Sequence, residues 1–207
     1  MTGEILRRAP LASRGADLGR MAGLTSGRVA AVDVSELVQV SLRLDPVEAV
    51  GSGSAVATLP LGIPPLTLPL EPNTTVGNAD RGALWLGPNE WLLVDAIGAL
   101  LPDEAGPTPS LVRELEAALS GTHHSVVDVS GGRAVIQLSG PGRLELLSSI
   151  CPLDLHPRVW EPGRCAQTVV GRAQALLQEL PDATRVFVRP SFAHYMVDLL
   201  LDAASAP

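Results

Sequence analysis

The amino-acid sequence predicts an α+β fold made of two-layer α/β sandwiches with mainly antiparallel sheets. Short stretches of period-two alternation are joined by tight turns, which is typical of antiparallel strands. The stretch 125–155 has the order strand, turn, strand, short helix, and an amphipathic helix follows Pro190. Hydrophobic residues make up 46% of the 207 residues, which is enough for the core of one domain or of two small ones.

The first 44 residues predict an arm and a strand. Residues 1–28 are rich in Ala, Gly and Arg without a clear period, so we expect a loosely ordered arm that either lies on a partner or frays. The stretch 34–44 alternates, with apolar residues on one face and Gln39, Ser41 and Arg43 on the other. This pattern predicts a half-buried strand.

Prolines and tryptophans mark the next segments. Five prolines interrupt the apolar stretch 59–73, which predicts an extended segment docked by its side chains on the chain's own core or on another subunit. Residues 81–95 predict a hairpin around Gly87-Pro88-Asn89-Glu90. Trp85 and Trp91 on its strands either anchor the core or contact a partner subunit. The stretch 111–119 then predicts a helix that ends before Gly121.

The stretch 125–155 is the part around which we expect the chain to be arranged. Its second strand, 134–138, is apolar on both faces, which favours a strand covered by helices over an exposed hairpin. Gly131-Gly132 marks the turn before this strand. Ser139-Gly140-Pro141 marks the start of a helix that Pro152 ends.

The last third predicts strands followed by a helix. We interpret 165–177 as two strands broken at Gly171-Arg172, because Thr168, Val169 and Val170 are poor helix formers. Residues 185–189 predict a further strand. The last helix is expected to bury one face, made of Phe192, Tyr195, Met196, Leu199, Leu200 and Ala203.

These elements suggest a division into the arm 1–28, a first α+β subdomain 29–120 and a second α+β subdomain 121–207. The alternative is that the two subdomains intertwine as one globular unit. Val32-Asp33-Val34-Ser35 echoes Val127-Asp128-Val129-Ser130, but the alternation that follows the two copies is out of phase. We therefore interpret the echo as chance.

Composition excludes several classes of function. The net charge of −7 argues against nucleic acid as a partner, and the absence of lysine excludes Schiff-base, phosphate-loop and general-base lysines. Cys151 and Cys165 form no CxxC pair and indicate reduced thiols of a cytoplasmic protein. No apolar run reaches the ~18 residues that span a bilayer, and none follows Arg7 and Arg8 as in a signal peptide.

The residues that carry chemistry form no self-sufficient set. Cys151 is expected to be a packing cysteine, with catalytic pairing to His123 or His156 as the alternative. Asp128 is expected to cap a turn, with ligand binding as the alternative. No histidine has a second one at i, i+4, so no metal site is expected: His123, His124, His156 and His194. The prediction is that this chain supplies no catalytic, cofactor-binding or metal-binding residue.

Three passages together resemble the gamma subunit of heterotetrameric sarcosine oxidase, in an order and spacing that match along about two-thirds of the chain. They are LWLGPNEWLLVD (84–95), SVVDVSGGRAVIQLSGPG with CPLDLHP (125–157), and RVFVRPSFAHYMVDLLLDAA (185–204). More distantly, VDVS…LSGP looks like the folate-binding aminomethyltransferase and YgfZ-type proteins. The resemblance implies an aminomethyltransferase-like fold.

The resemblance also implies a function. It implies a non-catalytic subunit that stabilises the alpha subunit of a complex oxidising sarcosine to glycine, with hydrogen peroxide and formaldehyde or methylene-tetrahydrofolate. It implies that the alpha subunit holds NAD and the tetrahydrofolate site, the beta subunit FAD and covalent FMN, and the delta subunit zinc. The gamma subunit of that family carries no assigned cofactor. The alternative is a stand-alone folate-binding protein of the aminomethyltransferase type, with Asp128 as the acidic candidate for the pterin.

Overall fold

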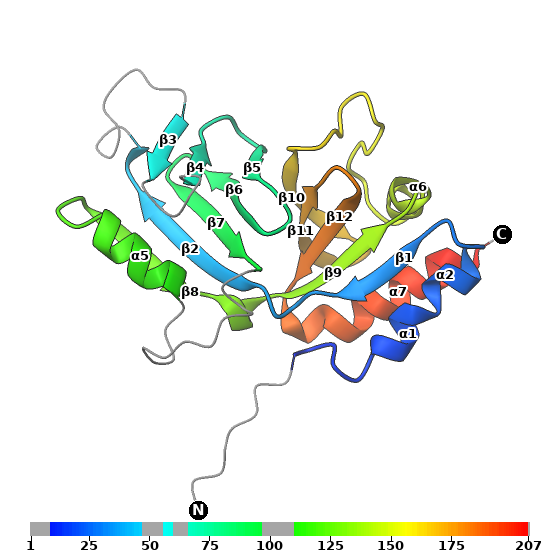
Figure 1. The fold of residues 1–207 in the computed structure, drawn as a ribbon. Coiled ribbons are helices and arrows are strands. Elements are labelled where there is room, and N and C mark those ends of the chain that lie inside the picture. The colour runs from blue at the N-terminus through cyan, green and yellow to red at the C-terminus, as the bar shows by residue number, and fades with distance from the viewer. Residues whose placement is uncertain (1–8, 47–55, 60–65, 97–109, 207) are drawn as a thin grey trace, which may run out of the picture.

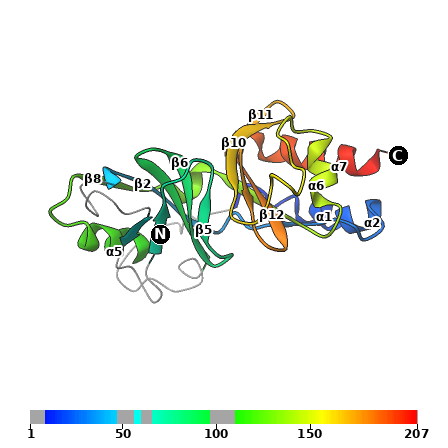
Figure 2. The same ribbon diagram turned by 90° about the horizontal axis from the view of Figure 1, so that it is seen from above.

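Two five-stranded antiparallel sheets face each other, and helices cover the outer side of each (Figures 1 and 2). This arrangement is seen in the computed structural model, which describes residues 9–46, 56–59, 66–96 and 110–206. Each sheet with its helices forms a two-layer sandwich. The predicted α+β fold with antiparallel sheets is therefore confirmed.

Sheet I has the strand order β5-β6-β7-β2-β8. Its strands are β2 (Val38–Leu44), β5 (Thr75–Gly77), β6 (Arg81–Gly87), β7 (Glu90–Asp95) and β8 (His124–Asp128). The predicted hairpin is β6–β7, with an irregular register between Trp85 and Gly87. A separate pair, β3 (Val56–Leu59) and β4 (Leu66–Pro69), lies beside this sheet through β4.

Sheet II has the strand order β1-β9-β12-β11-β10. Its strands are β1 (Ala30–Asp33), β9 (Ala134–Ser139), β10 (Cys165–Val170), β11 (Ala173–Glu179) and β12 (Ala183–Val188). The predicted break at Gly171-Arg172 is the β10–β11 turn. The hydroxyl of Tyr195 supports this turn by accepting a hydrogen bond of 3.0 Å from the backbone amide of Arg172.

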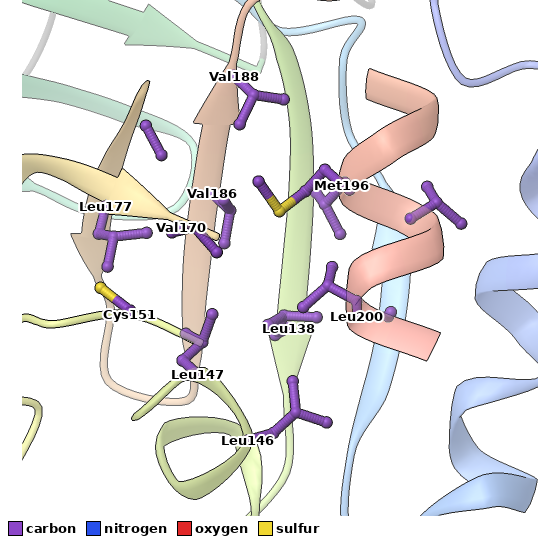
Figure 3. Packing of buried hydrophobic residues seen from close by; sticks show 14 of the residues in the cluster. Leu138, Leu146, Leu147, Cys151, Val170, Leu177, Val186, Val188, Met196 and Leu200 are labelled. Carbon is purple, nitrogen blue, oxygen red and sulfur yellow. The ribbon is translucent and has the colours of Figure 1, made fainter. Parts of the chain in front are cut away.

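Four helices cover the outer face of sheet II: α1 (Gly15–Gly19), α2 (Met21–Leu24), α6 (Arg143–Ser148) and α7 (Ala193–Ser205). Met196 and Leu200 of α7 point toward β9 and β12, where Leu138 and Val186 lie (Figure 3). The buried face of α7 differs from the predicted one. A short 3-10 turn, η2 (Pro190–Phe192), precedes α7 and leaves Phe192 38% exposed.

The N-terminal arm is ordered over residues 9–28. Leu11, Leu18 and Met21 are fully or almost fully buried in the core under sheet II, and α1 and α2 lie against α7 (Figure 1). The expectation of a loosely ordered arm is wrong for these residues. The apolar residues that anchor them are too few and too widely spaced to give a clear period.

The outer face of sheet I packs against α5 (Ser110–Ala118), which confirms the helix predicted over 111–119. Trp91 is completely buried there, and its indole N–H donates a hydrogen bond of 2.7 Å to the carbonyl oxygen of Pro69. Leu68 is buried in the same cluster. This part of the proline-rich stretch is therefore docked on the chain's own core, while residues 60–65 lie outside the described residues.

An apolar core also joins the two sheets. Its buried members are Leu37, Leu84, Leu92, Val94, Val135, Cys165, Leu176 and Phe187. Val135 of β9 thus faces sheet I, whereas Ile136 and Leu138 face the helices. The expectation of a strand covered by helices therefore holds for one face of 134–138, whereas the other face packs on the other sheet.

The two halves of the chain repeat one topology. Apart from the insertions β3–β4 and α6 and the 3-10 turns, the order β1, β2, β5, β6, β7, α5 is followed by β8, β9, β10, β11, β12, α7, and equivalent strands take equivalent places in the two sheets. The first strand of each series is exchanged: β1 pairs with β9 in sheet II, and β8 pairs with β2 in sheet I. The division expected at residue 120 therefore does not separate the sheets, and the two halves are intertwined.

The echoed sequences lie at equivalent crossings between the sheets. The Asp33 carboxylate accepts a hydrogen bond from the Ser35 amide at 2.9 Å, and the Asp128 carboxylate accepts one from the Ser130 amide at 2.9 Å. Each serine hydroxyl also contacts its aspartate. The interpretation of the echo as chance is wrong, since both copies build the same turn where the chain passes from one sheet to the other.

Candidate functional site

A cleft of about 380 Å³ opens on the inner face of sheet II. Leu176 and Phe187 of the inter-sheet core line it, together with Leu86 from sheet I. Its charged residues are Arg133, just before β9, and Arg189, just after β12. The cleft therefore brings two guanidinium groups into contact with open space.

Strand alternation explains why polar groups line this cleft. Arg133, Gln174 and Arg189 each lie two residues from a member of the inter-sheet core. Residues i and i+2 share one face of a strand, so these three side chains share the face that packs on sheet I. Among the described residues of sheet I, Leu86 lines the cleft.

The cleft holds two cations, and none of the described residues that line it carries a carboxylate. Arg133 is partly buried; its backbone carbonyl oxygen accepts a hydrogen bond of 3.2 Å from the side-chain amide of Gln39, but its guanidinium makes no hydrogen bond or ion pair with any residue in the described ranges. Burial lowers the pKa of the Arg133 guanidinium, the charge of Glu90 opposes this shift, and the charge of Arg189 adds to it. Glu90 itself is ion-paired with Arg43 at 2.8 Å.

Gln167 joins the two sheets beside the cleft. Its side-chain amide donates a hydrogen bond of 2.9 Å to the carbonyl oxygen of Leu86. Val169, two residues further along β10, is 40% exposed, and it also lines the cleft. The lining therefore combines cationic, amide and apolar surface.

Asp128, the acidic candidate for a pterin, takes the turn role. Its carboxylate accepts hydrogen bonds from the amide and the hydroxyl of Ser130, at 2.9 and 2.6 Å. It is not among the residues that line the cleft. The favoured expectation for Asp128, a turn cap, is confirmed.

The cysteines are buried in the apolar cores. Burial raises the pKa of the Cys165 thiol to about 12, and this thiol donates a hydrogen bond of 3.1 Å to the carbonyl oxygen of Thr74. Cys151 is 6% exposed, and its sulfur lies 3.8 Å from the hydroxyl oxygen of Thr168. A thiolate is the nucleophilic form, so the Cys165 environment disfavours nucleophilic chemistry.

The imidazoles of His124 and His156 make local hydrogen bonds. His124 contacts the carbonyl oxygen of Thr122 at 2.8 Å and the carboxylate of Glu116 at 3.1 Å, and these acceptors raise its pKa. His156 accepts a hydrogen bond of 3.2 Å from the amide of Arg158. Within the described ranges, no three metal-ligating side chains come together. In the same ranges, no helix is both long and apolar enough to cross a bilayer.

A buried polar cluster was not predicted from the sequence. Glu179 is 1% exposed, and its carboxylate pairs with Arg143 at 2.6 Å and accepts a hydrogen bond of 2.9 Å from the indole N–H of Trp160. The hydroxyl of Thr184 also donates to it. Every partner comes from this chain, so the cluster stabilises the fold around the start of α6 and the β11–β12 turn.

Arg133 and Arg189 were also missed. The sequence does contain a signal for them. Each arginine directly adjoins an apolar strand, and it lies two residues from a side chain of that strand that faces the other sheet. That signal requires knowing that β9 and β12 are neighbours, and this pairing appears only in the structure.

The chain is similar to proteins of one family. The model of the sarcosine oxidase, gamma subunit family matches residues 52–206. Sarcosine oxidase subunit gamma of Arthrobacter sp is 33% identical over 189 residues, which cover 88% of this chain and 85% of the relative. The same subunit of Corynebacterium sp. (strain U-96) is 31% identical over 202 residues, which cover 97% of this chain and 91% of the relative.

Two solved structures resemble this chain. A chain of heterotetrameric sarcosine oxidase from Corynebacterium sp. U-96, in complex with pyrrole 2-carboxylate, matches with a TM-score of 0.76 and 28% identity over 97% of both chains. Aminomethyltransferase T of the glycine cleavage system from Bartonella henselae matches with a TM-score of 0.63 and 14% identity. That match covers 95% of this chain and 57% of the transferase, and it shows the aminomethyltransferase-like fold alone. Sequence and structure together therefore establish that this chain belongs to the sarcosine oxidase gamma subunit family.

Proposed function

We propose that this chain is a non-catalytic subunit of a heterotetrameric, flavin-dependent sarcosine oxidase, and that it stabilises the alpha subunit. The observation that carries the proposal is the match over 97% of both chains to a component of such a complex. The side chains support a structural role, because the conspicuous ones are held by partners within the chain: Asp128 by Ser130, and Glu179 by Arg143.

The chemistry of the complex is assigned to the other subunits. The complex oxidises the N-methyl group of sarcosine to give glycine, hydrogen peroxide and formaldehyde or methylene-tetrahydrofolate. FAD, FMN, NAD, zinc and tetrahydrofolate are bound by the alpha, beta and delta subunits, and this chain binds none of them. The complex resides in the cytoplasm, where the two free cysteines stay reduced.

Co-expression tests this proposal. The tagged chain is produced with the alpha, beta and delta subunits of its own organism and recovered by affinity purification. We expect a yellow complex that oxidises sarcosine, and a loss of recovered alpha subunit when this chain is left out. Recovery of the chain alone, without colour, would refute the proposed role.

Variants test the non-catalytic assignment in the assembled complex. Cys151→Ala, His156→Ala and Asp128→Asn each remove a side chain that the sequence offered as a candidate for catalysis or ligand binding. We expect the turnover per flavin of each complex to equal that of the wild type. A hundredfold or greater fall, with normal assembly, would place chemistry on this chain, because removal of a general acid or base has effects of about 10²–10⁴-fold.

A stand-alone folate-binding function has no specific observation in its favour. Its acidic candidate Asp128 is engaged by Ser130 and lies outside the cleft lining. The likeness to aminomethyltransferase T supports the fold only. A titration of the isolated chain with tetrahydrofolate is expected to give no change in tryptophan fluorescence.

A further inference from the structure

We propose that the cleft with Arg133 and Arg189 is a docking site for an acidic side chain of a partner subunit. This inference rests on the proposed function, since it requires a partner. It names the surface of the chain that meets the partner and the chemistry that the partner supplies.

Among the arginines that the structure describes, Arg133 is unusual in its surroundings. Every other partly buried arginine of the described ranges has a carboxylate, carbonyl or amide acceptor, or a further interaction with the chain. The guanidinium of Arg133 has none, although burial lowers its pKa. A partly desolvated cation without a counter-charge is costly, and a carboxylate from outside removes this cost.

Two like charges, on Arg133 and Arg189, also meet in the cleft. Arg189 lies close enough to Arg133 to lower its pKa further, so the two cations repel each other in the free chain. Glu90 acts on Arg133 from the β6–β7 turn but is already paired with Arg43. An additional carboxylate between the two arginines relieves the repulsion and binds both guanidinium groups.

The surface of the cleft is apolar as well as charged. Val169 is 40% exposed in the cleft lining, and the half-buried Leu86 stands opposite on sheet I. Interfaces between proteins combine apolar contact with arginine anchors that become buried on binding. A free small carboxylate would leave this apolar surface exposed, which favours a protein segment as the occupant.

The experiment uses the assembled complex. Arg133→Gln/Arg189→Gln removes both charges and keeps much of each side-chain stem. Arg158→Gln/Arg172→Gln makes the same change of net charge at two exposed positions and serves as the control. Affinity is measured on the co-expressed, assembled complexes, by following the dissociation of this chain on dilution at several salt concentrations.

We expect the cleft pair to lower the affinity by about tenfold or more and to flatten its salt dependence, because truncated charge pairs at interfaces have effects of this size. The control pair should match the wild type. Equal affinity of the cleft pair and the wild type would overturn the inference. So would equal losses in both pairs, since overall charge would then explain the effect.

Chemical labelling of the wild type avoids dependence on folding of the variants. Phenylglyoxal modifies accessible arginines, and mass spectrometry gives the extent at each position. We expect Arg133 and Arg189 to be protected in the complex relative to the free chain. Unchanged labelling of both in the intact complex would overturn the inference, whereas failure of the wild-type chain to join any complex would overturn the proposed function instead.

Discussion

The hydroxyl oxygen of Ser35 accepts a hydrogen bond of 2.9 Å from the backbone amide of Val135, 100 positions further along the chain. This contact lies where β1 leaves sheet II and where β9 enters it. The equivalent contact at the other crossing joins the amide of Gln39 to the hydroxyl of Ser130 at 3.0 Å. At both crossings a serine hydroxyl therefore accepts a hydrogen bond from a backbone amide of the strand that enters the sheet.

Ser35→Ala is expected to lower the free energy of unfolding by about 1–3 kcal/mol, because the buried amide of Val135 loses its acceptor. Ser130→Ala should have a smaller effect, since Ser130 is only half-buried and water can replace its hydroxyl. Urea unfolding followed by tryptophan fluorescence measures both. Ser125→Ala, on the exposed side of β8, is the control and should stay within about 0.5 kcal/mol of the wild type.

The sequence predicts the strands well but not their partners. Alternation in 34–44 places Val40 and Leu42 on the apolar face, and the structure confirms it. Alternation contains no information on which strand lies next to which, so the exchange of β1 and β8 was not predicted. The echo of Asp33 and Ser35 in Asp128 and Ser130 was the available signal, but it encodes a turn and not a strand.

The predicted face of α7 illustrates a second limit. The prediction that Met196 and Leu200 are buried was correct. The structure also buries Ala193, Val197 and Ala204. Small residues carry a weak periodic signal, although they permit close approach to a sheet. The cleft shows the same limit, because Arg133 and Arg189 come together only through the pairing of β9 with β12.

Met196→Ala is expected to lower the free energy of unfolding by about 2–5 kcal/mol, because the side chain is completely buried between α7 and sheet II (Figure 3). Met196→Leu conserves volume and should cost less than about 1.5 kcal/mol. Phe192→Ala, at a position 38% exposed, should also cost less than Met196→Ala. A larger effect at Phe192 would mean that the helix face predicted from the sequence is the correct one.

Glu179→Gln is expected to lower the free energy of unfolding by about 3 kcal/mol, because it leaves the guanidinium of Arg143 without its buried counter-charge. The amide also turns a donor toward groups that donate, including the indole of Trp160. Thermal unfolding monitored by tryptophan fluorescence reports on this site directly.

Glu145→Gln is the matched control for that variant. Glu145 pairs with Arg28 on the surface, where the side chains are 71% and 59% exposed. Exposed pairs contribute about 0–1 kcal/mol, so this variant should unfold nearly as the wild type does. Equal effects of the two substitutions would contradict the importance of burial for the Glu179 cluster.

The thiol of Cys165 gives a prediction for alkaline pH. Its pKa is about 12 in the folded chain, against an ordinary value of 9.0, because burial disfavours the thiolate. Below pH 9 the thiol is protonated in both states, and its contribution to stability is fully present. Between pH 9 and 12 the unfolded chain loses the proton first, so the free energy of unfolding falls as pH rises.

Few other groups titrate in this range, because the chain has no lysine and one tyrosine. Cys165→Ala is therefore expected to flatten the decline of stability between pH 9 and 12, whereas Cys151→Ala should retain it. Urea unfolding at pH 8.5, 10 and 11 measures the slope for each variant. A Cys165→Ala chain whose stability falls as steeply as that of the wild type would show that the buried thiol is not the group that loses its proton.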